Sequence, residues 1–184
     1  MNVVVNSTFK GGNAPTGSVR LRTGATCYLV SCTFTENVSG PYNQSSVMKV
    51  YNTVSFANTK VKYNYYANQK DGTDHIQSSF IGTMSISGGR VKDNTNSLYD
   101  AQAAVSDYPL STALFGAYKD GVYPVVSEPA LSKGMTNAEL SALANEIKTQ
   151  MPDLDTKYFI WDQKGSPRDQ NEEVMGAYIG DVYL

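Results

Sequence analysis

The chain has 184 residues, of which 41% are hydrophobic and 17% charged, and its formal net charge is −2. This length suits one domain with a core, and the many Tyr, Asn, Ser, Thr and Gly residues are typical of a β-rich protein with many turns. The chain has no run of Lys or Arg and no apolar stretch of membrane-spanning length, which argues against nucleic acid as a partner and against a bilayer-spanning protein.

The N-terminal residues lack the pattern of a signal peptide. Met1 is followed by Asn-Val-Val-Val-Asn, which offers neither a basic segment nor an adequate apolar core. Because the first repeat block begins at once, we interpret the chain as a piece of a longer protein, in which an export signal would lie upstream.

Four similar blocks follow one another in the first half of the chain. Each block ends in Phe preceded by Thr or Ser, and the four Phe residues are 25, 22 and 24 positions apart. Repeats of this length are typical of solenoids, in which equivalent residues of successive coils lie above one another. We therefore predict one inward aromatic stack. Its members would be Phe9, Phe34, Phe56 and Phe80.

Short segments with alternating apolar and polar residues, bounded by Gly, Asn and Ser, run through residues 1–95 and predict β-strands. A parallel β-helix, whose coils stack about 4.8 Å apart, explains the fixed spacing of like residues. An antiparallel sandwich or barrel remains the alternative, although it gives no reason for that spacing. We predict an all-β fold with a small helical element, comprising about four β-helix coils in residues 1–95 and a C-terminal cap in residues 96–184.

The asparagines that follow three of the blocks are predicted turn residues, because Asn tolerates left-handed backbone conformations. They are Asn13, Asn37 and Asn58.

The two cysteines are predicted to be small buried thiols. Five steps along a straight strand would separate the α-carbons of Cys27 and Cys32 by roughly 16 Å, whereas a disulfide needs less than about 7 Å. Cys32 also takes a repeat position that we assign elsewhere to Ser7, Val54 and Ser78.

One amphipathic helix is predicted at about residues 137–151. Thr136 and Glu139 have the spacing of a capping box, and Pro152 ends the segment. The apolar residues between them fall on one helical face, which we expect to cover the open end of the β-helix. They are Leu140, Leu143, Ala144, Ile147 and Met151.

Two parts of the chain resemble known families. The stretch 17–37, with a second copy at 6–9, resembles the repeat of right-handed parallel β-helix surface proteins, including polymorphic outer-membrane proteins. The segments 128–134, 159–168 and 175–178 resemble the end of Bacteroidetes-type secreted β-helix proteins. The chain departs from that pattern at Lys133, at Met175 and at Ile179, the residue that follows the last segment. The resemblance implies a right-handed β-helix and a secreted or cell-surface location. It does not decide function, because adhesins, passenger domains, lyases and hydrolases share this fold.

A complete catalytic set is not evident. His75 is the single histidine, and Glu36 is the only acid that precedes Asp71, which argues against a triad or a pair of hydrolytic carboxylates. Asp71 and Asp74, like Asp153 and Asp155, are interpreted as solvated turn acids, and calcium stays open as a cofactor because neither pair has a full ligand set.

A second acid–base pair is interpreted as structural. Asp162 and Arg168 flank the turn formed by Gly165 and Pro167, and we predict that they pair across it.

The most promising binding residues lie in the Tyr-rich segment. Tyr63, Tyr65 and Tyr66, together with Arg20 and Lys62, could present aromatic faces and positive charge to a sugar, although packing between coils would also explain them.

We therefore expect a non-catalytic secreted or cell-surface module that is adhesive or binds a polysaccharide or host cell-surface glycan, and that stacks on upstream coils of the same chain. One alternative is the C-terminal part of a polysaccharide lyase or another carbohydrate-active enzyme, and another is a purely structural solenoid cap.

Overall fold

A computed structural model describes residues 1–56, 58, 64–68, 73–87, 90–92, 98–100, 115–125, 130–168 and 173–178. The structure is mostly β, with parallel pairing between all the described strands and one short α-helix. The strands are β1 (Asn2–Val5), β2 (Thr8–Lys10), β3 (Arg20–Leu21), β4 (Thr26–Val30), β5 (Thr33–Thr35), β6 (Tyr42–Gln44), β7 (Val47–Tyr51), β8 (Val54–Ser55), β9 (Tyr65–Asn68), β10 (Thr73–Gln77), β11 (Phe80–Ser87), β12 (Arg90–Lys92) and β13 (Leu98–Asp100). The helices are α1 (Asn137–Lys148) and the 3₁₀ helix η1 (Thr156–Ile160).

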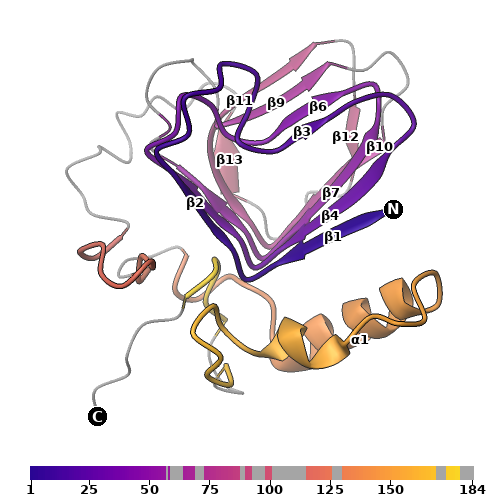
Figure 1. The fold of residues 1–184 in the computed structure, drawn as a ribbon, viewed down its shortest axis with the longest axis vertical. Coiled ribbons are helices and arrows are strands. Elements are labelled where there is room, and N and C mark those ends of the chain that lie inside the picture. Colours follow the sequence, from indigo (N-terminus) through magenta and orange to yellow (C-terminus); the bar gives the residue numbers. More distant parts are fainter. Residues whose placement is uncertain are drawn as a thin grey trace.

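The chain visits three ladders of parallel strands in turn (Figure 1). The first ladder is the five-stranded sheet β1-β4-β7-β10-β12, the second is β2-β5-β8-β11-β13, and the third is β3-β6-β9-β11. The long strand β11 belongs to the second and third ladders and joins them into one eight-stranded sheet. We call one passage through the ladders a rung. This arrangement is compatible with a parallel β-helix or solenoid, and it contradicts the antiparallel alternative for the described strands.

A left-handed residue forms the corner between the first and second ladders in the four rungs whose corner the structure describes. Its φ angle lies between 47° and 51°. One such residue bends the chain sharply, and Asn and Ser offset part of the steric cost because their short polar side chains bond locally. The four corner residues are Asn6, Ser31, Asn52 and Ser78.

The residue after each corner has a small hydroxyl or thiol group that donates to the backbone carbonyl two residues earlier. The distances are 2.9, 3.4, 2.9 and 2.8 Å. These residues are Ser7, Cys32, Thr53 and Ser79. Cys32 therefore does share a repeat position with Ser7, but the predicted equivalents Val54 and Ser78 were each wrong by one residue.

The predicted Phe stack is correct for one pair and wrong for the other. Phe9 and Phe34 pair in register, and their rings stack with centroids 4.5 Å apart. In the next rung, however, Phe34 pairs with Ser55, and Ser55 in turn pairs with Ile81. Phe56 and Phe80 instead form an edge-to-face contact in a separate cluster beneath the C-terminal residues. The predicted positions of Phe56 and Phe80 were each wrong by one residue, and a shift of one residue turns a strand side chain to the opposite face.

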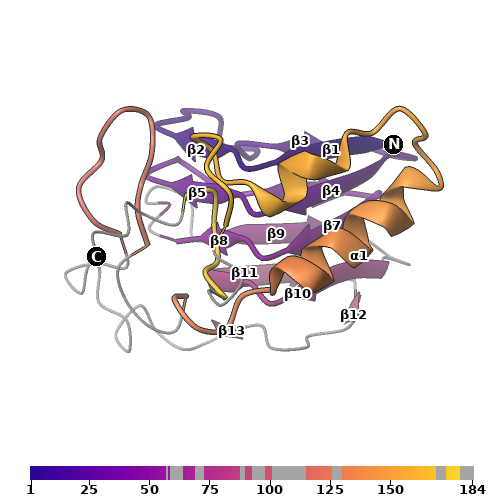
Figure 2. The same cartoon turned by 90° about the horizontal axis from the view of Figure 1, so that it is seen from below.

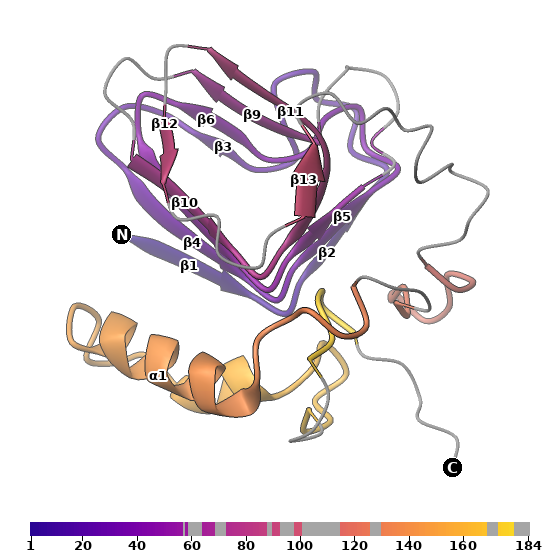
Figure 3. The same cartoon turned by 180° about the vertical axis from the view of Figure 1, so that it is seen from behind.

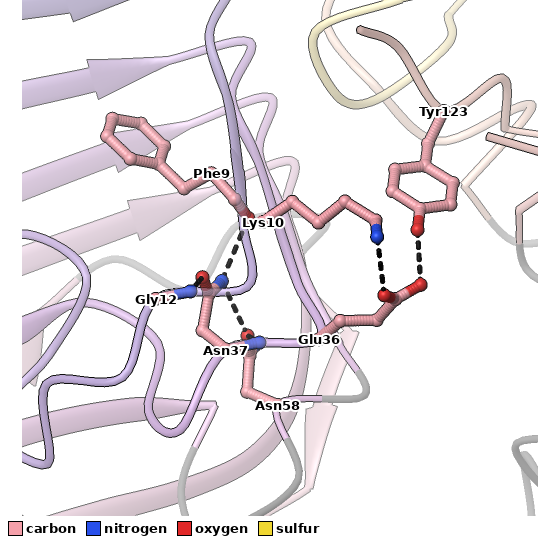
Figure 4. A network of polar contacts seen from close by, with 7 residues as sticks. All are labelled: Phe9, Lys10, Gly12, Glu36, Asn37, Asn58 and Tyr123. Atoms are coloured by element: carbon pink, nitrogen blue, oxygen red, sulfur yellow. Dashed lines mark hydrogen bonds and ion pairs between the residues drawn. The ribbon is translucent and has the colours of Figure 1, made fainter. Parts of the chain in front are cut away.

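Asn37 and Asn58 form a buried ladder of side-chain amides (Figure 4). The Asn37 amide nitrogen donates to the Asn58 side-chain oxygen at 2.9 Å, and the Asn37 oxygen accepts the backbone N–H of Gly12 at 2.9 Å. The left-handed residue at this turn is Glu36, with φ 55°. Asn37 lies in this turn as predicted, although its neighbour takes the left-handed conformation, and Gly12 rather than Asn13 occupies the equivalent place in the first rung.

Helix α1 begins at the predicted capping box and ends at Lys148, three residues before the predicted end. Its buried face packs on outward side chains of the first ladder, including Tyr28 and Val30 (Figure 2). The helix thus covers the side of this sheet, whereas we had predicted that it would cover the end of the stack. The reason is that the outer face of the first ladder is itself apolar and requires cover. No helix in the described part of the chain is long and apolar enough to cross a membrane.

The C-terminal residues cover the outer face of the second ladder. Val125, Ala130 and Met175 pack on Val54 and Phe80.

Gly176 allows the backbone to approach this face closely. Its N–H donates to the Asn52 carbonyl at 2.8 Å, and a Cβ atom there would lie 2.9 Å from the Thr33 hydroxyl.

Replacing Phe34 by Ala should lower the free energy of unfolding by roughly 3 to 5 kcal/mol, because this ring is fully buried. Phe9→Ala should cost less, since Phe9 is only half-buried. Urea unfolding followed by circular dichroism measures both values. Equal losses would contradict the interior position of Phe34.

Both thiols should be free and protected in the native protein. Cys27 and Cys32 are buried and unpaired, and burial raises the pKa of Cys27 to about 11 and that of Cys32 to about 12. A thiol reagent near pH 8 should therefore react slowly until the protein is unfolded, when it should label both residues. A mass two protons lower before reduction would instead reveal a disulfide.

Candidate functional site

The outer face of the third ladder carries a row of stacked polar and aromatic side chains. Arg20, Tyr42 and Tyr66 pair in register across β3, β6 and β9. Figures 1 and 3 show α1 and the C-terminal residues against the other two ladders, away from these strands. Of the three ladders, this one therefore has the outer face that the described C-terminal elements leave open.

The geometry of this row is regular. The Tyr42 and Tyr66 rings stack with centroids 4.5 Å apart and planes 14° from parallel. The Arg20 guanidinium lies 5.5 Å from the Tyr42 centroid and donates to the Gln44 side-chain oxygen at 2.7 Å. Parallel in-register pairing produces this stack, because it superposes equivalent residues of successive rungs. We call Arg20, Tyr42, Gln44 and Tyr66 the tyrosine row.

The structure brings together two of the five residues singled out in the sequence. Arg20 and Tyr66 belong to the tyrosine row, whereas Lys62 and Tyr63 lie outside the described residues. Tyr65 is fully buried, so the expectation that it faces a ligand was wrong. Alternation along β9 explains this result, since neighbouring residues of a strand point to opposite faces.

Tyr65 belongs instead to a polar cluster inside the stack. Its hydroxyl donates to one Asp74 carboxylate oxygen at 2.6 Å, and the other accepts from the Asn43 amide at 2.6 Å and the Met48 N–H at 2.8 Å. Burial raises the pKa of both Tyr65 and Asp74.

Asp74 is only 1% exposed, so its interpretation as a solvated turn acid was wrong. The error arose because β10 begins at Thr73, which turns Asp74 inward at the repeat position of Met48.

Glu36, the one acid that precedes Asp71 in the chain, serves to attach a C-terminal segment (Figure 4). Its carboxylate pairs with the Lys10 ammonium at 2.9 Å and accepts a hydrogen bond from the Tyr123 hydroxyl. That hydrogen bond and the Lys10 ammonium together lower the pKa of Glu36. This network holds residues 115–125 beside the second ladder. The Glu36 carboxylate therefore contributes no negative charge to the tyrosine row.

The predicted Asp162–Arg168 pair is replaced by contacts to backbone groups. The Arg168 guanidinium donates to the carbonyls of Trp161, Val174 and Gly176 at 3.3, 3.2 and 2.6 Å. Asp162 accepts the backbone N–H groups of residues 164 and 166, both at 2.9 Å. Both side chains are buried, and burial lowers the pKa of Arg168 to about 10.

Within the described residues, no three His, Cys, Asp or Glu side chains gather as a metal site. His75 pairs in register with Lys49 on the first ladder.

The chain matches no known family model, no curated protein and no solved structure in the comparisons made.

Asp74→Asn tests the buried cluster. Because the folded pKa of Asp74 is raised, its contribution to stability is present below the unfolded pKa and is lost as pH rises through the folded pKa. Asn keeps the acceptor for Met48 and carries no charge, so the variant should gain stability relative to the wild type from pH 4 to pH 7. Urea unfolding across this range measures the difference, with the exposed Asp153→Asn as control. A difference that is flat or falls with pH would contradict this account.

Proposed function

We propose that the chain is a right-handed parallel β-helix module of a secreted or cell-surface protein, without catalysis of its own, and that it binds glycans through the tyrosine row. The repeated order of three parallel ladders supports the fold. Strands β1, β2 and β3 each pair with the second rung. Their other edge suits a further rung, which we assign to upstream coils of the same chain.

The observation that carries the proposal is the in-register stack of Tyr42 and Tyr66 beside Arg20. Because Tyr66 and Arg20 cover the faces of the Tyr42 ring, the row offers a ligand mainly ring edges and tyrosine hydroxyl groups. These groups suit contacts with the C–H and hydroxyl groups of a sugar. Because the rungs repeat about every 4.8 Å, the row runs along the stack and suits a linear polysaccharide better than a single sugar. A flat row buries little of its ligand, so binding should be weak.

Arg20 gives the row its charge preference. Among the described residues its side chain contacts Tyr42 and Gln44, which are both uncharged. A carboxylate or sulfate on the glycan would supply the missing counter-charge. The exposure of Arg20 and screening by salt keep this contribution modest.

Tyr66→Ala and Tyr42→Ala should each weaken binding to a matching polysaccharide by roughly tenfold, which corresponds to about 1.4 kcal/mol. Arg20→Ala should weaken binding only modestly and reduce its salt dependence. A polysaccharide array followed by titration calorimetry measures these effects. Tyr118→Ala is the matched control, because Tyr118 is 49% exposed and lies outside the row. If Tyr118→Ala and Tyr66→Ala weaken binding equally, the row is not the site.

The same panel tests for catalysis. We expect no release of unsaturated uronates from acidic polysaccharides, with or without calcium. Release that Arg20→Ala abolishes would make a polysaccharide lyase the better description of this chain.

A further inference from the structure

A pocket of about 710 Å³ lies between the outer face of β1 and residues 151–165. This volume is in the usual range of small-molecule sites. Val3 and Val5 line it from the strand, and Leu154 and Phe159 line it from the C-terminal segment. The same four residues belong to the cluster that packs α1 on the first ladder, so the apolar lining is anchored in the core.

Two aromatic rings form one wall of the pocket. Tyr158 is 50% exposed, and its ring meets that of Trp161 edge to face, with centroids 6.4 Å apart. The Lys157 ammonium lies 4.9 Å from the Tyr158 centroid and 5.9 Å from that of Trp161. It also pairs with Asp155 at 2.9 Å. Lys157 thus packs its ammonium against both rings at the edge of the pocket.

Polar groups converge on the same space. Asn6, Asp153, Asp162 and Gln163 line the pocket beside the aromatic wall. Asp162 is 4% exposed, and its Oδ2 atom has no hydrogen-bond partner. A buried acceptor without a partner is costly, and a ligand hydroxyl or amino group satisfies it only after the side chains that cover this atom move.

The charge of the lining disfavours anions. Three carboxylates line the pocket, from Asp153, Asp155 and Asp162, and no Lys, Arg or His among the described residues does so. The nearby Lys157 is already paired with Asp155. A ligand carboxylate placed here would meet like charge.

We propose that this pocket binds a non-anionic sugar ring, either neutral or amino-bearing, with its apolar face on the Tyr158 ring, its edge against Trp161 and its donors toward Asp153. An apolar floor, an aromatic wall and several acceptors together fit a ring with one apolar face and many O–H donors. The inference extends the proposed glycan binding to a second site whose charge preference is opposite to that of the tyrosine row.

The single tryptophan provides the readout. Methyl glucoside, glucosamine and glucuronate are titrated into the full chain while Trp161 fluorescence and saturation-transfer NMR are recorded. Methyl glucoside and glucosamine should bind saturably in the millimolar range, and glucuronate should bind at least tenfold more weakly. Tyr158→Ala and Asp153→Asn, both at exposed positions, should weaken binding at least fivefold. The same titration of Tyr118→Ala should match the wild type.

Three outcomes would overturn the proposal: equal binding of glucuronate, no effect of Tyr158→Ala, or binding of butylammonium without methyl glucoside. The last would indicate a site for organic cations. Tyr66→Ala separates the two proposals, because it should leave binding of these small sugars unchanged. If Tyr66→Ala abolishes polysaccharide binding while Tyr158→Ala has no effect on any sugar, the pocket proposal fails and the proposed function stands.

Discussion

The left-handed corner between the first and second ladders is the constraint on which the rest of the structure depends. Asn6, Ser31, Asn52 and Ser78 take the same bend, and the following side chain bonds the carbonyl before it. A left-handed non-glycine residue costs about 1 to 2 kcal/mol, which this local bond helps to offset. Because the corner has the same bend in the four rungs where it is described, the strands on both sides keep their register, and differences in rung length are absorbed elsewhere.

The corner also attaches the C-terminal residues. The Asn52 side chain accepts the Met135 N–H at 3.0 Å and donates to the Val174 carbonyl at 3.2 Å. The Asn6 amide oxygen accepts from Arg168, and its nitrogen donates to the Tyr158 carbonyl. The Asn6 and Asn52 side chains, at two of the four corners, thus reach outward to the C-terminal residues. Because these contacts join parts of the chain that are far apart in sequence, the N-terminal rungs and the C-terminal segments stabilise each other.

Local patterns in the sequence predicted the parallel repeat, the Phe9–Phe34 stack and the capping box of α1. The predicted strand register was wrong where the loops between strands change length. The rung from Phe34 to Ser55 is shorter than the Phe spacing suggests, and the rung from Ser55 to Ile81 is longer, so Phe80 moves to the outer face.

Other features depend on contacts that no local pattern contains. The buried Asp74 was missed because polar residues near a glycine resemble a turn. The position of α1 depends on which sheet face is apolar, which no helical pattern reveals. Of the proposed row, Arg20 and Tyr66 were predicted, while their alignment with Tyr42 required the register.

In-register pairing of the strands has different consequences inside and outside the stack. Inside, superposed polar residues satisfy one another, as in the amide ladder of Asn37 and Asn58, so a chain with few charges can bury hydrogen-bonding groups. Outside, the same superposition stacks the Tyr42 and Tyr66 rings along the third ladder. At the first rung the outer face of β1 is instead closed by a folded segment, and a concave pocket results. One repeat geometry thus yields a flat row suited to a polymer and an open pocket suited to a single ring, because only one of the two faces carries a C-terminal cover.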